Sequence, residues 1–317
     1  MMLGKGLNYS QRVFRYYERY KDIIPGYDEF LSHLLKPLPH SIRVNTLKIS
    51  PERLIQRMEA KGFILKQSKL HPWFFEVEYT EERGLGATLE HTLGYYYVQE
   101  IVSGIPPIAL DPKPWEVILD MAAAPGSKTT QIAQMMGCKG TIVANDISRE
   151  RIKALKSNLD RLGVTNTVIT VCDARRFRSS ILFDRILLDA PCSSEATIRK
   201  DPSLQLDFSY RSTKWFSRLQ KGMVERAYNL LKDDGVLVYS VCTFAPEECE
   251  EVVEHALKIG FKIEQVNIPL KHMEGIVEWV DERGRRYRFD PDVSRSIRIY
   301  PHFEDTGGMF IAKFRKV

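Results

Sequence analysis

The sequence predicts an α/β protein with a doubly wound, mostly parallel sheet and a smaller N-terminal α/β unit. From residue 115 onward, continuous apolar segments alternate with amphipathic segments of helical length, a pattern typical of parallel strands covered by helices on both faces. The proline-rich segment 105–115 interrupts the periodicity and marks a boundary. The length of 317 residues also suits two domains. We therefore expect domains over residues 1–110 and 111–317.

The N-terminal unit combines helical and extended patterns. The segment PERLIQRMEAKG opens with proline and ends at glycine, as helices commonly do. We expect helices within 10–21, 25–35 and 51–62, and strands within 41–49 and 73–79.

The larger unit repeats strand, loop and helix along the chain. Its two last apolar segments flank HFEDTGG, which makes an antiparallel pair plausible at the end of the sheet. We expect strands within 115–122, 141–147, 167–173, 183–190, 236–243, 295–301 and 309–315, and helices within 127–136, 149–163 and 247–257 and through Leu231.

Composition restricts the function classes. A net charge of +5 permits a polyanionic partner without requiring one, and the basic bias of 149–178 is also typical of a solvated helix face. No apolar run reaches the roughly 20 residues that span a bilayer, so we expect a cytoplasmic protein without membrane attachment. The five cysteines form no CxxC pair, so we expect neither a metal site nor disulfides.

Three acidic residues follow the first three strands of the larger unit. Asp120, Asp146 and Asp173 are spaced by about one strand–helix unit, which places them at the edge of the sheet that binds ligands. Asp146 is placed to bind ribose hydroxyls and Asp173 to contact a base, which together indicate a nucleoside. The alternative is that these aspartates cap the following helices.

The loop after the first strand indicates which nucleoside derivative binds. DMAAAPGSKT resembles a phosphate-binding loop only superficially and lacks the GxGxxG of dinucleotide sites. Small residues, proline and glycine let backbone N–H groups approach a ligand at a helix N-terminus, and a carboxylate such as that of methionine suits this loop. The candidate loop residues are Ala122, Ala123, Ala124, Pro125, Gly126, Ser127 and Lys128.

Two cysteines and an acid follow the next two strands. LLDAPCSS places Asp189 and Cys192 at the ligand edge, and VYSVCTFAPEE places Cys242 there. A single cysteine is more often a small buried hydrophobic residue. Two thiols at neighbouring strand ends instead indicate a nucleophile with an acid/base group beside it.

These motifs resemble the Nop/Sun family of RNA 5-methylcytosine methyltransferases, which have a Rossmann-like methyltransferase domain and an RRM-like N-terminal subdomain. The matching segments run in family order from Asp120 to Phe314, and SIRVNTLK and YYVQE match an upstream segment. They are DMAAAPGSKT, ANDIS, CDARRF, DRILLDAPCSS with IRKDP, YSVCTFAPEE and RIYPHFEDTGGMFIAKF.

The resemblance implies S-adenosylmethionine as cofactor and assigns the catalytic residues. Cys242 is the nucleophile, Cys192 aids product release, and Asp189 contacts the cytosine. Carbon 5 of cytosine becomes nucleophilic only after a thiolate adds at carbon 6, and the adduct must later lose a proton and expel the thiolate. The resemblance places the cofactor against residues 122–128, Asp146, Asp173, Asp189 and Arg151.

Further residues are matched by the resemblance. Lys214 corresponds to a lysine near the site, although a solvated helix lysine is an equal alternative. Arg43 and Asn45 could contact RNA or serve the structure. Arg298 and the Pro301–His302 pair belong to a segment that helps to shape the target pocket.

We expect an RNA substrate, tRNA in particular, and a monomer. The N-terminal unit lacks the aromatic RNP1 motif, which disfavours readout by stacking, and the target cytosine must leave its stack to reach Cys242. The alternatives are an rRNA methyltransferase, a DNA cytosine methyltransferase with Cys192 as nucleophile, a non-catalytic RNA-binding factor, and, least favoured, a nicotinamide dehydrogenase.

Overall fold

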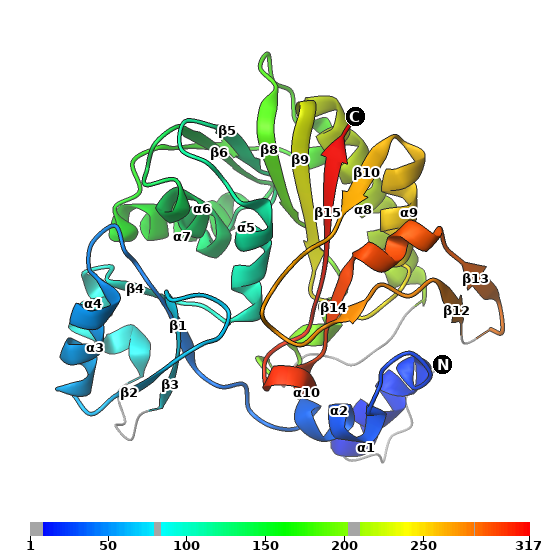
Figure 1. Cartoon of the computed structure of the whole chain (residues 1–317), viewed down its shortest axis with the longest axis horizontal. Helices are drawn as coiled ribbons and strands as arrows, with labels where there is room; N and C mark the ends of the chain where they lie inside the picture. The colour runs from blue at the N-terminus through cyan, green and yellow to red at the C-terminus, as the bar shows by residue number, and fades with distance from the viewer. Residues whose placement is uncertain (1–8, 79–83, 202–209, 282) are drawn as a thin grey trace.

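The computed structural model describes residues 9–78, 84–201, 210–281 and 283–317. Within them, a mixed sheet of nine strands flanked by helices lies beside a four-stranded antiparallel sheet (Figure 1). The predicted α/β fold class, with a smaller α/β unit near the N-terminus, is confirmed. The predicted strand WFFEVEY and the motif IRKDP end at Tyr79 and Pro202, which lie outside the described residues. Residues 1–8, at the start of the chain, also lie outside them.

The large sheet has the order β11-β14-β15-β9-β8-β5-β6-β7, with β10 also paired to β15. Strands β5 to β9 run parallel, and β15 inserts antiparallel between β9 and β14. The antiparallel pair expected at 295–315 is therefore present. The strands are β5 (Val117–Asp120), β6 (Thr141–Asp146), β7 (Thr167–Val171), β8 (Phe183–Asp189), β9 (Leu231–Val241), β10 (Phe261–Glu264), β11 (Met273–Glu274), β14 (Ile297–Ile299) and β15 (Met309–Lys316).

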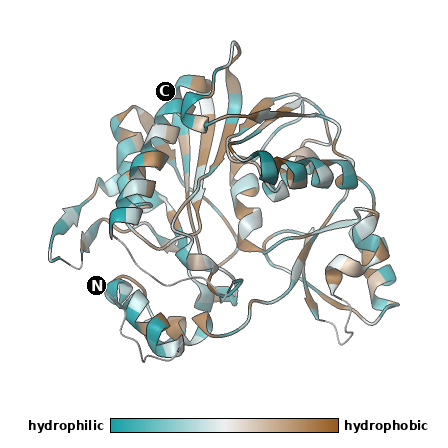
Figure 2. Cartoon of the chain, turned by 180° about the vertical axis from the view of Figure 1, so that it is seen from behind, coloured by the Kyte–Doolittle hydropathy of each residue, from teal (hydrophilic) through white to brown (hydrophobic). Residues whose placement is uncertain are grey.

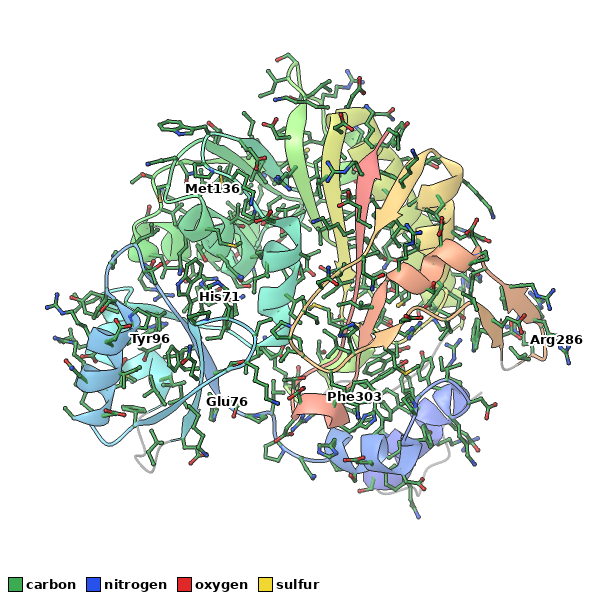
Figure 3. The ribbon with its side chains drawn as sticks, viewed as in Figure 1. His71, Glu76, Tyr96, Met136, Arg286 and Phe303 are labelled. Atoms are coloured by element: carbon green, nitrogen blue, oxygen red, sulfur yellow. The ribbon has the colours of Figure 1, made fainter. Side chains whose placement is uncertain are left out.

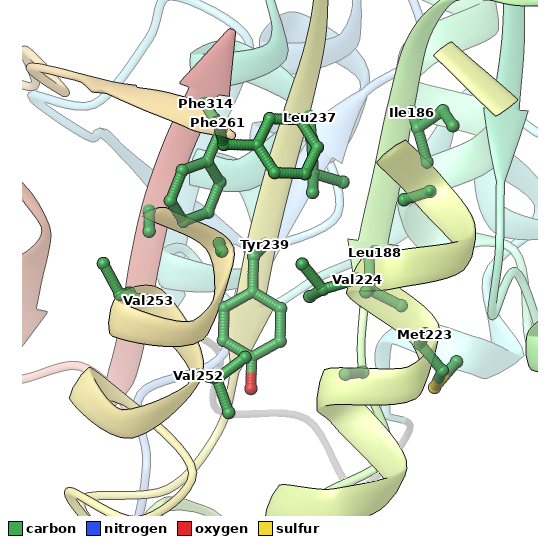
Figure 4. Packing of buried hydrophobic residues seen from close by; sticks show 14 of the residues in the cluster. Ile186, Leu188, Met223, Val224, Leu237, Tyr239, Val252, Val253, Phe261 and Phe314 are labelled. Carbon is green, nitrogen blue, oxygen red and sulfur yellow. The ribbon is translucent and has the colours of Figure 1, made fainter. Parts of the chain in front are cut away.

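Helices cover both faces of this sheet, as its continuous apolar strands require. One face packs α5 (Ile105–Leu110), α6 (Ser127–Met135) and α7 (Arg149–Leu162), and the other packs α8 (Tyr210–Leu230) and α9 (Glu250–Lys258). Figure 4 shows the second layer, in which residues of α8 and α9 surround Tyr239 of β9. Seen from behind, the strands are mostly apolar and the outer faces of the helices mostly polar (Figure 2).

Helix ends in the large unit follow local chemistry. Ser148 caps α7 by accepting a hydrogen bond from the Arg151 N–H, and Gly163 ends the helix at φ 74°. The predicted break at 105–115 differs in part, because Ile105–Leu110 forms the buried helix α5. Its two prolines lie in the first turn, where a helix needs no N–H donor. The division at residue 110 stays a prediction.

The smaller unit follows the βαββαβ order of RRM-like domains. Its sheet order β2-β3-β1-β4 brings the first and third strands together at the centre. The elements are β1 (Ser41–Val44), α3 (Pro51–Glu59), β2 (Ile64–Gln67), β3 (Phe74–Glu78), α4 (Leu89–Thr92) and β4 (Tyr96–Val98).

The face of this sheet that points away from α3 is covered by the large unit. Phe74 packs in the core that also holds α5 and α6. Arg43 is 1% exposed and donates hydrogen bonds to Gln99, to the Ser127 carbonyl and to Thr130. RNA therefore has no access to these side chains of the sheet.

Arg43 and Asn45 consequently join the two units, and the expectation that they contact RNA is wrong in this structure. Asn45 donates to the carbonyls of Gly94 and Leu162, at 2.8 and 2.9 Å, and is buried. Both side chains satisfy polar groups that docking of the units removes from water. Of the two interpretations from the sequence, the structural role is the one that fits both residues.

The first helices pack on the large unit. Tyr17 of α1 (Tyr9–Tyr17) donates to the Glu195 carbonyl at 2.6 Å, and Phe30 of α2 (Tyr27–Leu34) contacts Phe244 edge to face. The hairpin formed by β12 (Glu278–Val280) and β13 (Arg286–Arg288) projects at the edge of the molecule near these helices (Figure 1), and Arg19 lies over its Trp279 ring. The remaining short helices are η1 (Glu18–Tyr20), η2 (Leu85–Ala87), η3 (Val102–Gly104), η4 (Ala174–Arg176), η5 (Glu195–Thr197), η6 (Pro291–Arg295) and α10 (Pro301–Glu304).

Candidate active site

Two thiols meet at the carboxyl ends of β8 and β9. The Cys192 and Cys242 sulfur atoms are 3.3 Å apart, although 50 residues separate them in the sequence. Cys192 is 8% exposed, whereas Cys242 is only partly buried and lines a cavity of about 280 Å³. The hydroxyl of Ser194 lies 3.9 Å from the Cys242 sulfur. Of the two thiols, Cys242 is the one that a molecule in the cavity can reach.

One hydrogen bond joins the two thiols, and it shifts their pKa values in opposite directions. The bond from the Cys192 thiol lowers the pKa of Cys242 below its ordinary value, and Ser194 and Lys128 act in the same direction against burial. The same bond, together with burial, raises the pKa of Cys192 well above its ordinary value. The arrangement favours a thiolate at Cys242 and a protonated thiol at Cys192.

An ion pair lies beside the thiols. The Lys128 ammonium is 2.5 Å from the Asp189 carboxylate, whose other oxygen accepts a hydrogen bond from Ser240 at 2.7 Å. Burial alone would lower the pKa of Lys128, but Asp189 and the thiol of Cys242 raise it above its ordinary value. Lys128 therefore carries its positive charge toward the thiols, whereas the resemblance placed it against the cofactor.

The cavity is formed by both units and by the C-terminal segment. Lys128, Asp189 and Cys242 lie on one wall, and residues of β4 and of the loop before β15 lie on the others. The sequence analysis did not single out the following lining residues, although some belong to quoted motifs: Tyr97, Val98, Gln99, Glu100, Ala196, Thr197, Arg199, Lys200, Gly307, Gly308 and Met309.

Glu100 and two glycines hold the far wall of the cavity. The Glu100 carboxylate accepts hydrogen bonds from the backbone N–H of Gly307 and of Val102, at 3.0 and 3.2 Å. A Cβ atom at Gly308 would lie 2.4 Å from the ring of Phe244. Packing therefore requires glycine at position 308, whereas a Cβ atom at Gly307 would lie 3.2 Å from the Glu100 carboxyl group.

The loop 120–129 forms a tight turn at the N-terminus of α6. Asp146 accepts hydrogen bonds from the N–H groups of Ala124 and Ser148 at 3.1 and 2.9 Å, and the Ala124–Pro125 bond is cis. Gly126 has φ 105°, and a Cβ atom there would lie 2.9 Å from Leu155. The loop therefore brings backbone close to the strand ends, as the small residues predicted.

The predicted cofactor residues lie together around this loop. Asp146 is 2% exposed, and the Arg151 guanidinium lies 3.4 Å from it while also donating to the Ala124 carbonyl. Asp173 accepts from the Arg175 N–H and side chain, which with Arg176 hold its pKa below the ordinary value. A ribose could reach Asp146 only if Arg151 moved aside.

Two residues near these acids refine the nucleoside prediction. Asp120 is 1% exposed and accepts from the Thr129 hydroxyl at 2.7 Å, so it binds a side chain of α6 but does not cap that helix. The capping alternative describes Asp173, which accepts from the Arg175 N–H at the start of η4. Burial raises the pKa of Asp120 to about 7. Ile147 is 67% exposed directly after β6 and offers an apolar surface for a base, a feature that its apolar strand motif concealed.

The remaining predicted residues lie outside the cavity. Lys214 pairs with Glu251 between α8 and α9. Arg298 is buried, pairs with Glu250 and donates to the Phe244 carbonyl, which holds the segment after Cys242 in place. His302 bonds the Pro25 carbonyl at 2.8 Å, beside Pro301 at the start of α10.

A buried carboxyl lies behind the thiols. Glu248 accepts hydrogen bonds from the Ser193 N–H at 3.1 Å and from Gln220 at 2.9 Å. Burial raises the pKa of Glu248 to about 8, so this side chain is largely neutral at pH 7. It holds the loop that carries Cys192.

Among the described residues, no cluster of three or more histidine, cysteine or acidic side chains could hold a metal ion. The same part of the chain contains no helix with the length and apolar character needed to cross a membrane.

Comparison with known families and proteins gives matches along most of the chain. Residues 107–315 match the family described as 16S rRNA methyltransferase RsmB/F, and residues 14–101 match the N-terminal domain of 16S rRNA methyltransferase RsmF. The chain is 46% identical to the tRNA (cytosine(49)-C(5))-methyltransferase of Pyrococcus abyssi, with 94% of each chain covered. It is 41% identical to the ribosomal RNA small subunit methyltransferase F of Shewanella woodyi, with 92% of this chain and 60% of that protein covered.

Solved structures resemble the whole chain. A methyltransferase homologue from Pyrococcus horikoshii is 32% identical with a TM-score of 0.84, covering 98% of this chain and 99% of its own. NSun6 from Pyrococcus horikoshii, solved with SFG, is 27% identical with a TM-score of 0.81, covering 96% and 97%.

Proposed function

Since the chain belongs to the RsmB/F family of RNA methyltransferases, we propose that it methylates carbon 5 of a cytosine in tRNA through a covalent bond to Cys242. The observation that supports this most is the pair of thiols 3.3 Å apart, of which only Cys242 lines the cavity. S-adenosylmethionine, the cofactor of this family, supplies an electrophilic methyl group when bound.

Addition and methylation use the wall that carries Cys242. The Cys242 thiolate bonds to carbon 6 of the ring, and the electrons of the 5,6 double bond move toward the ring nitrogen. The Lys128–Asp189 pair hydrogen-bonds that side of the ring and balances the charge that develops there. Carbon 5 then takes the methyl group as the donor's carbon–sulfur bond breaks.

Release requires a base and a leaving group. Once Cys242 is bonded to carbon, it no longer raises the pKa of Cys192 through their hydrogen bond or its negative charge, so Cys192 can release its proton to solvent. Cys192 then takes the proton from carbon 5, the 5,6 double bond re-forms, and the Cys242–carbon 6 bond breaks to return the thiolate. This sequence gives the two cysteines different tasks.

The cofactor residues are also part of the proposal. Residues 122–128 present backbone at the strand ends, and Asp146, Asp173, Asp189 and Arg151 border the same region. The small side chains of this loop let a ligand approach its backbone closely, and the turn at Gly126 lets the loop pack against Leu155.

Three features support tRNA, a monomer and a cytoplasmic location. The chain is 46% identical to the relative named for tRNA and 41% identical to a relative named for ribosomal RNA. One chain supplies every wall of the cavity, which supports a monomer. A tRNA substrate supports the cytoplasm. Ribosomal RNA is the alternative substrate, because relatives named for it are also close.

Bisulfite sequencing tests the proposal. The wild type, Cys242→Ala and the control Cys138→Ala are incubated with S-adenosylmethionine and with tRNA or ribosomal RNA transcripts. We expect new 5-methylcytosine in tRNA from the wild type and the control, and none from Cys242→Ala. Methylation confined to ribosomal RNA would favour the alternative, and undiminished methylation by Cys242→Ala would overturn the mechanism.

A further inference from the structure

Positive charge and an aromatic ring lie together on the outer side of α8. Arg211, Trp215 and Arg218 follow at positions i, i+4 and i+7, so they share one face of the helix. Trp215 is 57% exposed, and both arginines are exposed. A large exposed aromatic side chain between two guanidinium groups is not needed for the core.

A neighbouring hollow on α8 adds charge. A cavity of about 490 Å³ is lined by Arg211, Lys214, Arg218 and Lys221 together with Ser217 and Glu251. Lys214 and Lys221 both pair with Glu251, whereas Arg211 and Arg218 make no ion pair within the described residues. Four cations against one anion leave a local charge of about +3.

Helix α8 contacts the catalytic loop through its buried face, opposite the exposed face that carries Arg211, Trp215 and Arg218. Gln220 of α8 donates a hydrogen bond to the Pro191 carbonyl, the residue before Cys192. Arg211 lies nine residues earlier on the helix, about 14 Å along its axis at about 1.5 Å per residue. That span corresponds to roughly four stacked nucleotides at about 3.4 Å each.

The arginine-rich hairpin continues the charge. Lys214 lies 5.6 Å from the centre of the Tyr287 ring, so β13 borders the α8 surface. Arg285, Arg286 and Arg288 of the hairpin are exposed. Figure 3 shows Arg286 at the outer edge of the molecule, directed away from the body.

We propose that the α8 surface, defined as Arg211, Lys214, Trp215, Arg218 and Lys221, binds the RNA strand that flanks the target cytosine. The arginines contact phosphates, and the Trp215 ring stacks on an unpaired base. This inference rests on the proposed function, because it assigns a docking surface for the same substrate. It gives the RNA an exposed aromatic side chain for stacking, which the covered sheet face of the N-terminal unit does not offer.

Kinetics with two substrates tests the inference. A full tRNA transcript and a cytosine-containing trinucleotide, too short to reach α8, are compared for wild type, Trp215→Ala and Arg211→Ala/Arg218→Ala. With tRNA, we expect KM to rise roughly fivefold or more for each variant, kcat to stay within about twofold, and the dependence of log affinity on log salt to weaken by about one or two contacts for the arginine variant. With the trinucleotide, all proteins should behave alike.

Lys153→Ala/Lys156→Ala on α7, which removes two exposed cations from the opposite face of the sheet, should leave KM for tRNA unchanged. An unchanged KM in the α8 variants, or an equal loss with both substrates, would overturn the inference. Absence of methylation by the wild type would instead contradict the proposed function itself.

Discussion

At the scale of single residues, the two thiols differ in which of them carries the proton. Cys192 is buried and its sulfur lies 3.3 Å from that of Cys242, and the hydrogen bond between them lowers the pKa of Cys242, so this partly exposed sulfur is favoured as the thiolate. Reactive cysteines are those whose thiolate is stabilised and accessible. Cys242 meets both conditions. Cys192 is buried, and its pKa stays raised until Cys242 is bonded to the cytosine.

Replacing Cys192 should therefore change the titration of Cys242. In Cys192→Ala the hydrogen bond that stabilises the thiolate is lost, so the pKa of Cys242 rises. The rate of Cys242 alkylation by iodoacetamide, followed by mass spectrometry against pH, should reach its midpoint at a higher pH than in the wild type. A midpoint that stays in place or moves lower would show that Cys192 does not stabilise the thiolate.

The sequence could predict which residues meet but not how they are paired. The order of the motifs was enough to predict that Asp189, Cys192 and Cys242 lie at one edge of the sheet. It could not show that Lys128 turns from the cofactor loop to Asp189, because that contact depends on the distance between two loops. Nor could it show that Arg151 covers Asp146.

At the scale of elements, buried polar side chains fasten the small sheet to the large unit. Arg43 of β1 reaches α6, and Asn45 reaches the last residue of α7. The sequence left two interpretations of these residues open because a polar residue at the end of a strand occurs both in binding sites and in buried junctions. Only the docking of the units decides between them.

Removing Arg43 should cost stability. Arg43→Ala leaves the Gln99 side-chain oxygen without this donor and removes one of the hydrogen bonds to the Ser127 carbonyl, to which Thr130 also donates. We expect a loss of about 2–5 kcal/mol in the free energy of unfolding. Urea denaturation measures it, with exposed Arg53→Ala as the control. A variant of normal stability but weakened RNA binding would restore the interpretation as an RNA contact.

Two glycines with similar backbone angles allow the cost of backbone strain to be distinguished from the cost of steric crowding. A Cβ atom at Gly94 would lie 1.9 Å from the Arg161 carbonyl oxygen, whereas one at Gly62 would meet nothing within 4 Å, at φ 71° and 83°. Gly62→Ala should cost about 1 kcal/mol from backbone strain, and Gly94→Ala clearly more, because the units must move apart. Equal midpoints in thermal unfolding of the two variants would contradict the close docking at Gly94.

At the scale of the whole molecule, the catalytic cavity lies where three parts of the chain meet. β4 of the small unit, the strand ends of the large unit and the glycine loop before β15 all line it. The alternation of strands and helices predicted the large sheet well, since periodicity is local. The covered face of the small sheet was not predictable, because it depends on contacts between segments far apart in sequence.

The buried carboxyl of Glu248 should make stability depend on pH. Its pKa is about 8 in the folded protein against an ordinary value of 4.5, so the folded state holds a proton that the unfolded state has lost. Its contribution is complete below about pH 4.5 and is lost as pH rises through 8, on the order of 5 kcal/mol in all. Glu248→Gln should lose less stability than the wild type between pH 5.5 and 8.5 in urea denaturation. A wild-type slope retained in the variant would assign the effect to other groups, such as Asp120.

The central claim, that Cys242 bonds the cytosine and Cys192 releases it, is tested most directly by trapping the adduct. Cys192→Ala is incubated with tRNA and S-adenosylmethionine, denatured and digested, and the cross-linked peptide is identified by mass spectrometry. We expect a methylated cytosine bonded to the sulfur of Cys242, with no adduct in Cys192→Ala/Cys242→Ala. Normal multiple turnover by Cys192→Ala, or an adduct on Cys192 in Cys242→Ala, would contradict the account.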